Sequence, residues 1–126
     1  MKINIIGSIL GTSGYDSHTR NLANALYKIA DVKLTTSLSP DWHKHVNDAE
    51  LDMITKPGSD EDINLIITTP HNWKIYTGIG RNIVYCVWEG DKVPQSYIDE
   101  MLNNNIDLVL VPSNHTKEAI INTIRE

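Results

Sequence analysis

Residues 1–26, MKINIIGSILGTSGYDSHTRNLANAL, contain the pattern that decides the fold. The apolar run from Ile3 to Leu10 has the length of a strand, and Leu22 and Leu26 then recur at the spacing of one helix face. The glycines of Gly11–Tyr15 lie between them, where a chain would turn from strand to helix. A strand, a glycine turn and a helix in this order predict one unit of a parallel sheet.

Four further apolar runs follow, at residues 32–38, 63–69, 83–88 and 106–111. The first of these alternates apolar and polar residues, which predicts a strand with one wetter face. The runs at 63–69 and 83–88 are rich in Ile and Val on both faces, so we expect helices on both sides of them. Only Pro70 to Asn82 connects these two, which leaves room for a loop or a single turn.

Helical segments are predicted between most of these runs. Trp42, Val46, Ala49 and Met53 predict one helix that starts at Ser39-Pro40 and ends at Pro57-Gly58. Another should follow Pro94 and stop in the asparagines at 103–105, and a last one should begin near Ser113 or Asn114. The predicted fold class is α/β: a Rossmann-like, doubly wound parallel sheet of five strands that forms a single domain over residues 1–126.

Composition narrows the function classes. Hydrophobic residues make up 40% and charged residues 21%, as in globular proteins, and the net charge is −5 with scattered Lys and Arg. We therefore expect no nucleic-acid partner. The N-terminus lacks signal-peptide features and no apolar stretch has the ~20 residues of a membrane helix, although peripheral membrane contact stays open. Cys86 is alone, so no internal disulfide forms, and we expect a cytoplasmic protein.

The glycine turn predicts a phosphate-binding loop, with Gly11, Ser13 and Gly14 at the start of a helix whose N–H groups are unpaired. A tight turn that binds nothing is an equal alternative. The spacing of Gly7, Gly11 and Gly14 is GxxxGxxG, which differs from the dinucleotide fingerprint GxGxxG, and no Gly-Lys-Ser/Thr follows as in a Walker loop.

Metal-binding patterns are weak. Asp60-Glu61-Asp62 reads as DxD, but it precedes the strand at 63–69 and so belongs to the amino edge of the sheet, away from the expected site. His43 and His45 are two positions apart, so on a helix they face different directions. We expect no bound metal.

His71 and Glu89 are the candidate catalytic residues, because each lies just past the carboxyl end of a strand, where doubly wound folds bind ligands. A histidine there can transfer a proton near neutral pH, and a glutamate beside Trp88 can orient a sugar hydroxyl. Polar caps on surface loops are the alternative interpretation for both residues.

Two passages resemble the family-four glycosyltransferases of the GT-B fold. Residues 1–26 are similar to the first strand, glycine loop and first helix of that family. The second passage runs from Tyr85-Cys86-Val87-Trp88-Glu89-Gly90-Asp91-Lys92-Val93-Pro94 to Asp107-Leu108-Val109-Leu110-Val111-Pro112-Ser113-Asn114-His115-Thr116-Lys117-Glu118-Ala119, and is similar to the family's Trp-Glu-Pro and Val-Pro-Ser segments. Residues 40–62 match no segment of the family.

The resemblance implies two Rossmann-like domains that face each other across a cleft. The C-terminal domain would hold most of the nucleotide-sugar, and the N-terminal domain most of the acceptor. Sugar transfer would retain the anomeric configuration, without a metal or other cofactor, as the leaving diphosphate helps remove the acceptor proton. Residues 1–126 would be the N-terminal, acceptor-side domain, with the C-terminal donor domain absent, and would be inactive alone.

On this basis the expected partners are a nucleotide-sugar, a glycan or other hydroxyl acceptor, and the missing C-terminal domain. Self-association is expected through the uncovered face, with Trp73, Trp88, His71 and Glu89 exposed on it. The implied site residues fall into three groups: catalytic His71 and Glu89; donor-binding Gly11, Ser13 and Gly14; and acceptor-binding Tyr15, Trp73, Trp88, Asp91 and Ser113.

Two other functions remain open from sequence. A non-catalytic binding or interaction module could use the same scaffold. A small nucleotide-dependent oxidoreductase is disfavoured by the glycine spacing. A second strand–helix domain in the downstream coding sequence would separate the glycosyltransferase from the binding module.

Overall fold

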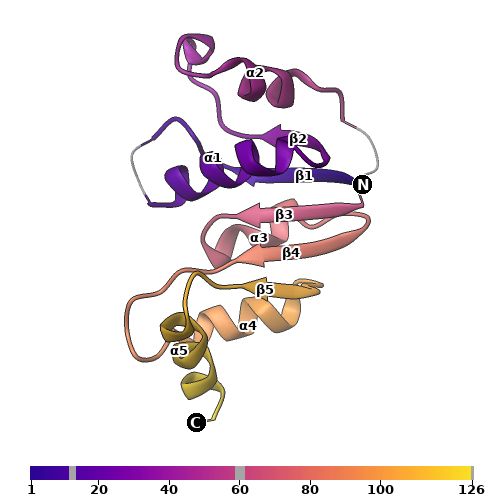
Figure 1. Ribbon diagram of the computed structural model, residues 1–126. Coiled ribbons are helices and arrows are strands. Elements are labelled where there is room, and N and C mark those ends of the chain that lie inside the picture. The colour runs from indigo at the N-terminus through magenta and orange to yellow at the C-terminus, as the bar shows by residue number, and fades with distance from the viewer. Residues whose placement is uncertain (12–13, 59–61, 126) are drawn as a thin grey trace.

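The fold is built on one sheet of five strands, all parallel, in the order β2-β1-β3-β4-β5 (Figure 1). The computed structural model describes residues 1–11, 14–58 and 62–125. The strands are β1 (Lys2–Gly7), β2 (Asp31–Thr35), β3 (Ile63–Ile67), β4 (Arg81–Tyr85) and β5 (Leu108–Leu110). The predicted α/β class, with its Rossmann-like parallel sheet, is confirmed.

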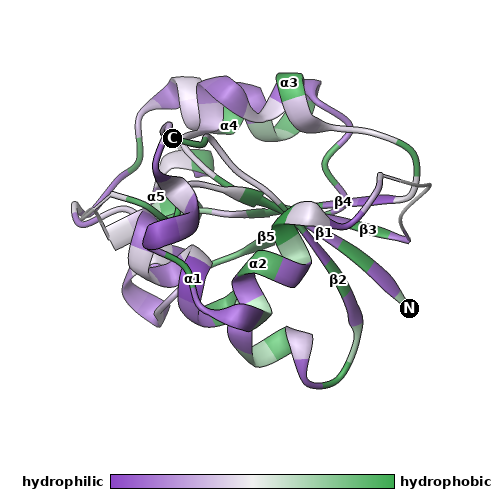
Figure 2. Ribbon diagram, turned by 90° about the horizontal axis from the view of Figure 1, so that it is seen from above, coloured by the Kyte–Doolittle hydropathy of each residue, from purple (hydrophilic) through white to green (hydrophobic). Residues whose placement is uncertain are grey.

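Helices lie on both sides of this sheet. In Figure 2, α3 and α4 lie on one side and α1 and α2 on the other. The elements outside the sheet are α1 (Gly14–Tyr27), the 3-10 turn η1 (Trp42–Lys44), α2 (Asp48–Thr55), the 3-10 turn η2 (Pro70–Asn72), α3 (Trp73–Tyr76), α4 (Gln95–Asn103) and α5 (Asn114–Ile124). None of the described helices is long and apolar enough to cross a membrane.

Two hydrophobic clusters follow from the alternation of side chains along the strands. Ile3 and Ile5 of β1 pack with residues of α1, β2 and α2, whereas Ile6 points to the opposite face and packs with Trp73. A third cluster joins α4 to α5 through Val93, Ile98 and Ala119. The strand order reverses between β1 and β3, since the chain leaves β1 for one edge and returns past it to β3. Such a reversal is where doubly wound sheets bind ligands.

The predicted helix from Ser39 to Gly58 is wrong in its first half. The chain there forms only η1, and α2 begins after Asn47. Asn47 accepts a hydrogen bond from the Glu50 backbone N–H at 2.7 Å, and the Glu50 carboxylate accepts the Asn47 N–H at 2.9 Å. This capping box starts a helix at Asn47, so the apolar spacing of Trp42 and Val46 does not continue one.

The wetter face predicted for the second strand is confirmed, because Val32 and Leu34 are buried while Thr35 is exposed. β3 is buried on both faces as expected, but β4 is not. Ile83 and Tyr85 are only half-buried on the α1 side, and Leu108 and Leu110, paired with them in β5, are exposed. The prediction of helices on both sides of the fourth strand is therefore wrong on the side of the sheet that faces α1.

The ends of the last two helices agree with the sequence. α4 follows Pro94 and stops at Asn103, and Asn105 has φ 55°, a left-handed conformation that asparagine adopts more readily than most residues. Ser113 caps α5 by accepting a hydrogen bond from the Thr116 N–H at 3.3 Å. The single turn predicted between the third and fourth strands is η2 with α3.

Candidate functional site

A hollow of about 390 Å³ opens at the carboxyl ends of β3 and β4. We call it the carboxyl-edge hollow, and its lining residues come from α1, the loops after β3 and β4, and α4: Tyr15, Thr69, Val87, Trp88, Glu89, Gly90 and Tyr97. Three residues predicted from the sequence, Tyr15, Trp88 and Glu89, meet here. Tyr15 and Glu89 are 74 positions apart along the chain, and the parallel sheet brings the ends of their strands together.

The aromatic wall of this hollow is formed by Trp88 and Tyr97, whose rings pack edge to face with centroids 5.4 Å apart. Trp88 Nε1 is buried and has no hydrogen-bond partner among the described residues. A Cβ at Gly90 would lie 2.9 Å from that nitrogen, so the indole fits only because residue 90 has no side chain. Gly90 thus leaves the space that the Trp88 indole occupies at this wall.

The first turn of α5 holds this segment from behind. His115 Nε2 lies 2.9 Å from the Glu89 backbone oxygen, and Thr116 Oγ1 donates to the Trp88 backbone oxygen at 3.3 Å. These contacts fix the backbone, while the Glu89 side chain stays exposed at the hollow. A carboxylate presented in this way can accept hydrogen bonds from a hydroxylated ligand.

Tyr15 lies in the first turn of α1 and is half-buried. Burial, followed by the neighbouring Cys86 and Tyr97, raises the pKa of Tyr15 to about 12, and a backbone hydrogen bond with Val87 lowers it less. Its phenol is therefore protonated at neutral pH and serves as a neutral hydrogen-bonding group. Burial likewise raises the pKa of the Cys86 thiol to about 11, which makes this buried cysteine a poor nucleophile.

The other predicted site residues do not line the hollow. His71 is exposed at η2, with Nε2 3.4 Å from Oγ1 of Thr69, and so flanks it through that threonine. Asp91 is exposed and its backbone oxygen accepts from Asn122 at 3.2 Å. Ser113 uses its hydroxyl to cap α5.

Trp73 corrects one expectation. Its side chain is completely buried against β3 and β4, and Nε1 donates to the Thr68 backbone oxygen at 3.1 Å. The prediction that Trp73 is exposed on the cleft face is wrong, because α3 turns the indole into the core. Tyr97, and not Trp73, lines the hollow beside Trp88. Only the packing of α4 reveals this role of Tyr97.

Part of the hydrogen-bonding capacity of the glycine turn is used within the chain. Gly11 donates its N–H to the Asp16 carboxylate at 3.1 Å, and Asp16 is buried in the first turn of α1. One of the N–H groups expected to bind phosphate is thus already paired. Gly14 begins α1 with no atom within 4 Å of the place its Cβ would take. Ser13 lies outside the described residues.

The acidic run can be placed only at its last residue. Asp62 accepts the Lys2 backbone N–H at 2.9 Å, directly before β3 and hence at the amino edge of the sheet. Asp60 and Glu61 lie outside the described residues. Among the residues that the structure does describe, no group of three or more His, Cys, Asp and Glu side chains could hold a metal ion.

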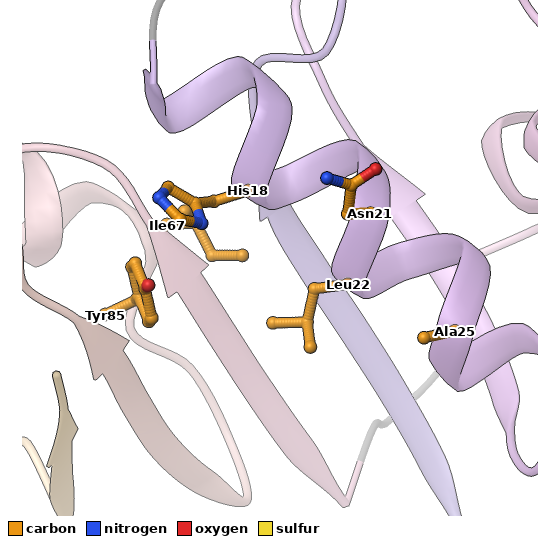
Figure 3. A pocket seen from close by; sticks show the side chains of 6 residues that line it. All are labelled: His18, Asn21, Leu22, Ala25, Ile67 and Tyr85. Atoms are coloured by element: carbon orange, nitrogen blue, oxygen red, sulfur yellow. The ribbon is translucent and has the colours of Figure 1, made fainter. Parts of the chain in front are cut away.

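An apolar groove of about 270 Å³ lies between α1 and the ends of β3 and β4 (Figure 3). Its lining comes from α1, β3 and β4: His18, Asn21, Leu22, Ala25, Ile67 and Tyr85. The His18 and Tyr85 rings lie 5.4 Å apart, and the exposed Leu108 and Leu110 continue the uncovered side of the sheet. The self-association expected from sequence concerned the face that carries Trp88 and Glu89, which do not line this groove, and it remains a prediction.

Comparison of the chain with protein-family models, with curated proteins and with solved structures finds no match. The function is therefore inferred from the residues and geometry of this chain.

Proposed function

We propose that this domain is the acceptor-binding half of a retaining glycosyltransferase, which transfers a sugar from a nucleotide-sugar to a hydroxyl of a glycan or other acceptor. The observation that carries the proposal is the carboxyl-edge hollow, which joins an aromatic wall to an exposed carboxylate at the ligand-binding edge of a doubly wound sheet. Sugars have apolar C–H faces and hydroxyl rims, and this lining offers partners for both.

In this proposal the rings of Trp88 and Tyr97 pack against a sugar face, and the Tyr15 phenol and the Glu89 carboxylate hydrogen-bond its hydroxyls. Glu89 orients the hydroxyl that attacks the donor sugar. Such positioning supplies much of the rate when two bound reactants must meet. His71 flanks the site, and its contribution would be to a more extended acceptor that reaches beyond Thr69.

The donor would be held mainly by a second, C-terminal domain. Gly11 is already paired with Asp16, so the start of α1 offers few contacts to a diphosphate. We therefore expect the 126-residue chain alone to show no sugar transfer and only weak binding of uridine or guanosine diphosphate by calorimetry. The proposal also places the protein in a reducing compartment such as the cytoplasm, in keeping with its single thiol.

The test is a transfer assay with the full-length protein, a panel of nucleotide-sugars and a panel of glycan acceptors, with the product anomer assigned by NMR. Glu89→Gln should lower kcat/KM by about tenfold or more, the loss of a charged hydrogen bond to the acceptor. Glu118→Gln is the matched control, because Glu118 is an exposed glutamate on α5 outside the hollow, and it should leave kcat/KM unchanged.

Three outcomes would contradict the proposal. Tight nucleotide binding or turnover by the 126-residue chain would show a complete enzyme. Glycan binding without transfer by the full-length protein would favour the non-catalytic module. Equal effects of the Glu89 and Glu118 substitutions would remove the carboxyl-edge hollow from the reaction.

A further inference from the structure

A second hollow, of about 350 Å³, lies where the strand order reverses, at the carboxyl ends of β1, β2 and β3. Its walls are Ser8 after β1, residues 35–37 at the end of β2, Thr68 after β3, and Asn72 and Tyr76 from η2 and α3. Ile6 forms part of its lining, on the face of the sheet that carries α3. We call it the hydroxyl-lined hollow. It shares no lining residue with the carboxyl-edge hollow.

Most of the side chains that line this hollow are neutral and polar. Apart from Ile6 and Gly7, each lining residue carries a hydroxyl or an amide. Thr35 Oγ1 donates to Asn4 at 2.8 Å, and Asn72 Nδ2 donates to Thr69 at 3.1 Å. No bond to another described residue engages the side-chain hydroxyls of Ser8, Ser37, Thr68 and Tyr76. Each of these hydroxyls can both donate and accept a hydrogen bond, so together they can bind a ligand that does the same.

The hollow is held open by rigid parts of the fold. The buried Trp73 binds the Thr68 backbone oxygen through Nε1 at 3.1 Å, and the Asn72 N–H donates to the Thr69 oxygen at 3.0 Å, which fixes the loop after β3. On the opposite wall, a Cβ at Gly7 would lie 2.8 Å from Thr19 Oγ1 and 2.9 Å from the Ile67 oxygen. The end of β1 is thus packed tightly between α1 and β3, and a ligand would meet a preformed surface.

The charge of the lining selects against ions. No Lys, Arg, His, Asp or Glu side chain lines the hollow in the described chain. A phosphate or carboxylate entering it would lose hydration without gaining an opposite charge, which is unfavourable. A neutral molecule with several hydroxyls exchanges its hydrogen bonds with water for hydrogen bonds with these side chains, while its C–H groups contact Ile6 and the ring of Tyr76.

We propose that the hydroxyl-lined hollow is a second ligand site, which binds a small uncharged polyol or monosaccharide. The volume fits the lower end of the usual range for small-molecule pockets. The site does not depend on the proposed transferase function, since its lining residues, and hence its ligand contacts, are separate from those of the carboxyl-edge hollow.

The experiment is an NMR titration of the isotopically labelled chain with glycerol, myo-inositol and glucose, and separately with inorganic phosphate. We expect at least one polyol to give saturable millimolar shifts centred on the amides of Gly7, Ser8, residues 36–37 and Thr68. Thr68→Val keeps the shape and removes the hydroxyl, so it should weaken binding by about fivefold, the effect of one hydrogen bond, while Thr68→Ser retains the affinity.

Tyr76→Phe is a second variant that should also weaken binding, and it tests the site if Thr68→Val proves unstable, because Tyr76 is exposed. Glu89→Gln in the carboxyl-edge hollow should leave these shifts unchanged. Absence of saturable shifts with all three polyols, or tighter binding of phosphate at the same amides, would overturn the proposal. Loss of the shifts in Glu89→Gln would do so too, since it would assign them to the other hollow.

Discussion

Asn64 of β3 donates a hydrogen bond from Nδ2 to Oδ1 of Asn82 in β4, at 3.2 Å, within the sheet and away from solvent. The two residues are register partners. Asn82 also accepts the Gly78 N–H at 3.0 Å and donates to the backbone oxygens of Gly78 and Asn105, each at 3.3 Å. One buried amide thereby ties the loop before β4 and the loop before β5 to the sheet.

Replacing Asn82 should be costly. Asn82→Ala leaves the Gly78 N–H and the Asn64 amide without this partner, and we expect a loss of about 2–4 kcal/mol in the free energy of unfolding. Asn103→Ala is the control, because Asn103 is exposed at the end of α4 and should change stability by less than about 0.5 kcal/mol. Urea denaturation measures both. Equal midpoints for the two variants would show that the buried amide contributes nothing.

Glu50 is the second buried polar group on which stability should depend. Its side chain is 3% exposed and forms an ion pair with Arg20 at 2.9 Å, while Asn24 donates to it at 2.9 Å and Asn47 at 2.9 Å. Glu50→Ala removes these contacts, including the half of the capping box that the Glu50 carboxylate forms with the Asn47 N–H, so we expect a loss of about 2–4 kcal/mol. Glu118→Ala, at an exposed position of α5, serves as the reference in thermal and urea unfolding. A neutral result at Glu50 would contradict the assigned role.

The thiol of Cys86 should make the free energy of unfolding depend on pH in the alkaline range. Burial raises the pKa of its thiol to about 11 in the folded chain, against about 8.5 when unfolded. Between these values the unfolded chain has lost the proton that the folded chain keeps, so stability falls as the pH rises. Urea midpoints measured from pH 7 to 10 should fall less steeply in Cys86→Ala. The native thiol should also react slowly with a disulfide reagent at pH 8, and a fast reaction would refute its burial.

Gly14→Val in the full-length protein tests whether the glycine turn takes part in the proposed sugar transfer. No atom lies within 4 Å of the added Cβ, so folding should tolerate the change, while a ligand approaching the start of α1 would meet the new side chain. We expect kcat/KM to fall by about tenfold or more. Gly58→Val is a matched control with equal space around its Cβ, and it should leave the rate unchanged. Wild-type kinetics for Gly14→Val with an intact fold would exclude the turn from the site.

The acidic run at residues 60–62 should be dispensable for the proposed sugar transfer. The Asp62 carboxylate accepts the Lys2 backbone N–H at the amino edge, opposite to the edge that carries Glu89. Replacing Asp60 and Asp62 together by Asn should therefore preserve full-length activity, with or without added manganese. Loss of activity that manganese restores would show a metal site and reverse this expectation.

The sequence by itself determined the strands, their parallel arrangement and most helix ends, because apolar periodicity, glycine turns and caps act over a few neighbouring residues. The capping box of Asn47 and Glu50 is also a local sequence pattern. It was not used for the prediction, because the apolar spacing of the preceding residues favoured a longer helix. The meeting of Tyr15, Trp88 and Glu89 could be predicted, since each follows a strand and parallel strands end at one edge.

Only the tertiary structure decided the direction of individual side chains. Trp73 and Trp88 both follow strands, yet α3 turns one indole into the core, while the absence of a side chain at Gly90 lets the other lie at the hollow. The hydroxyl-lined hollow likewise joins residues from three strand ends and α3 that form no sequence motif. Such sites depend on packing between distant segments, and local sequence patterns do not encode it.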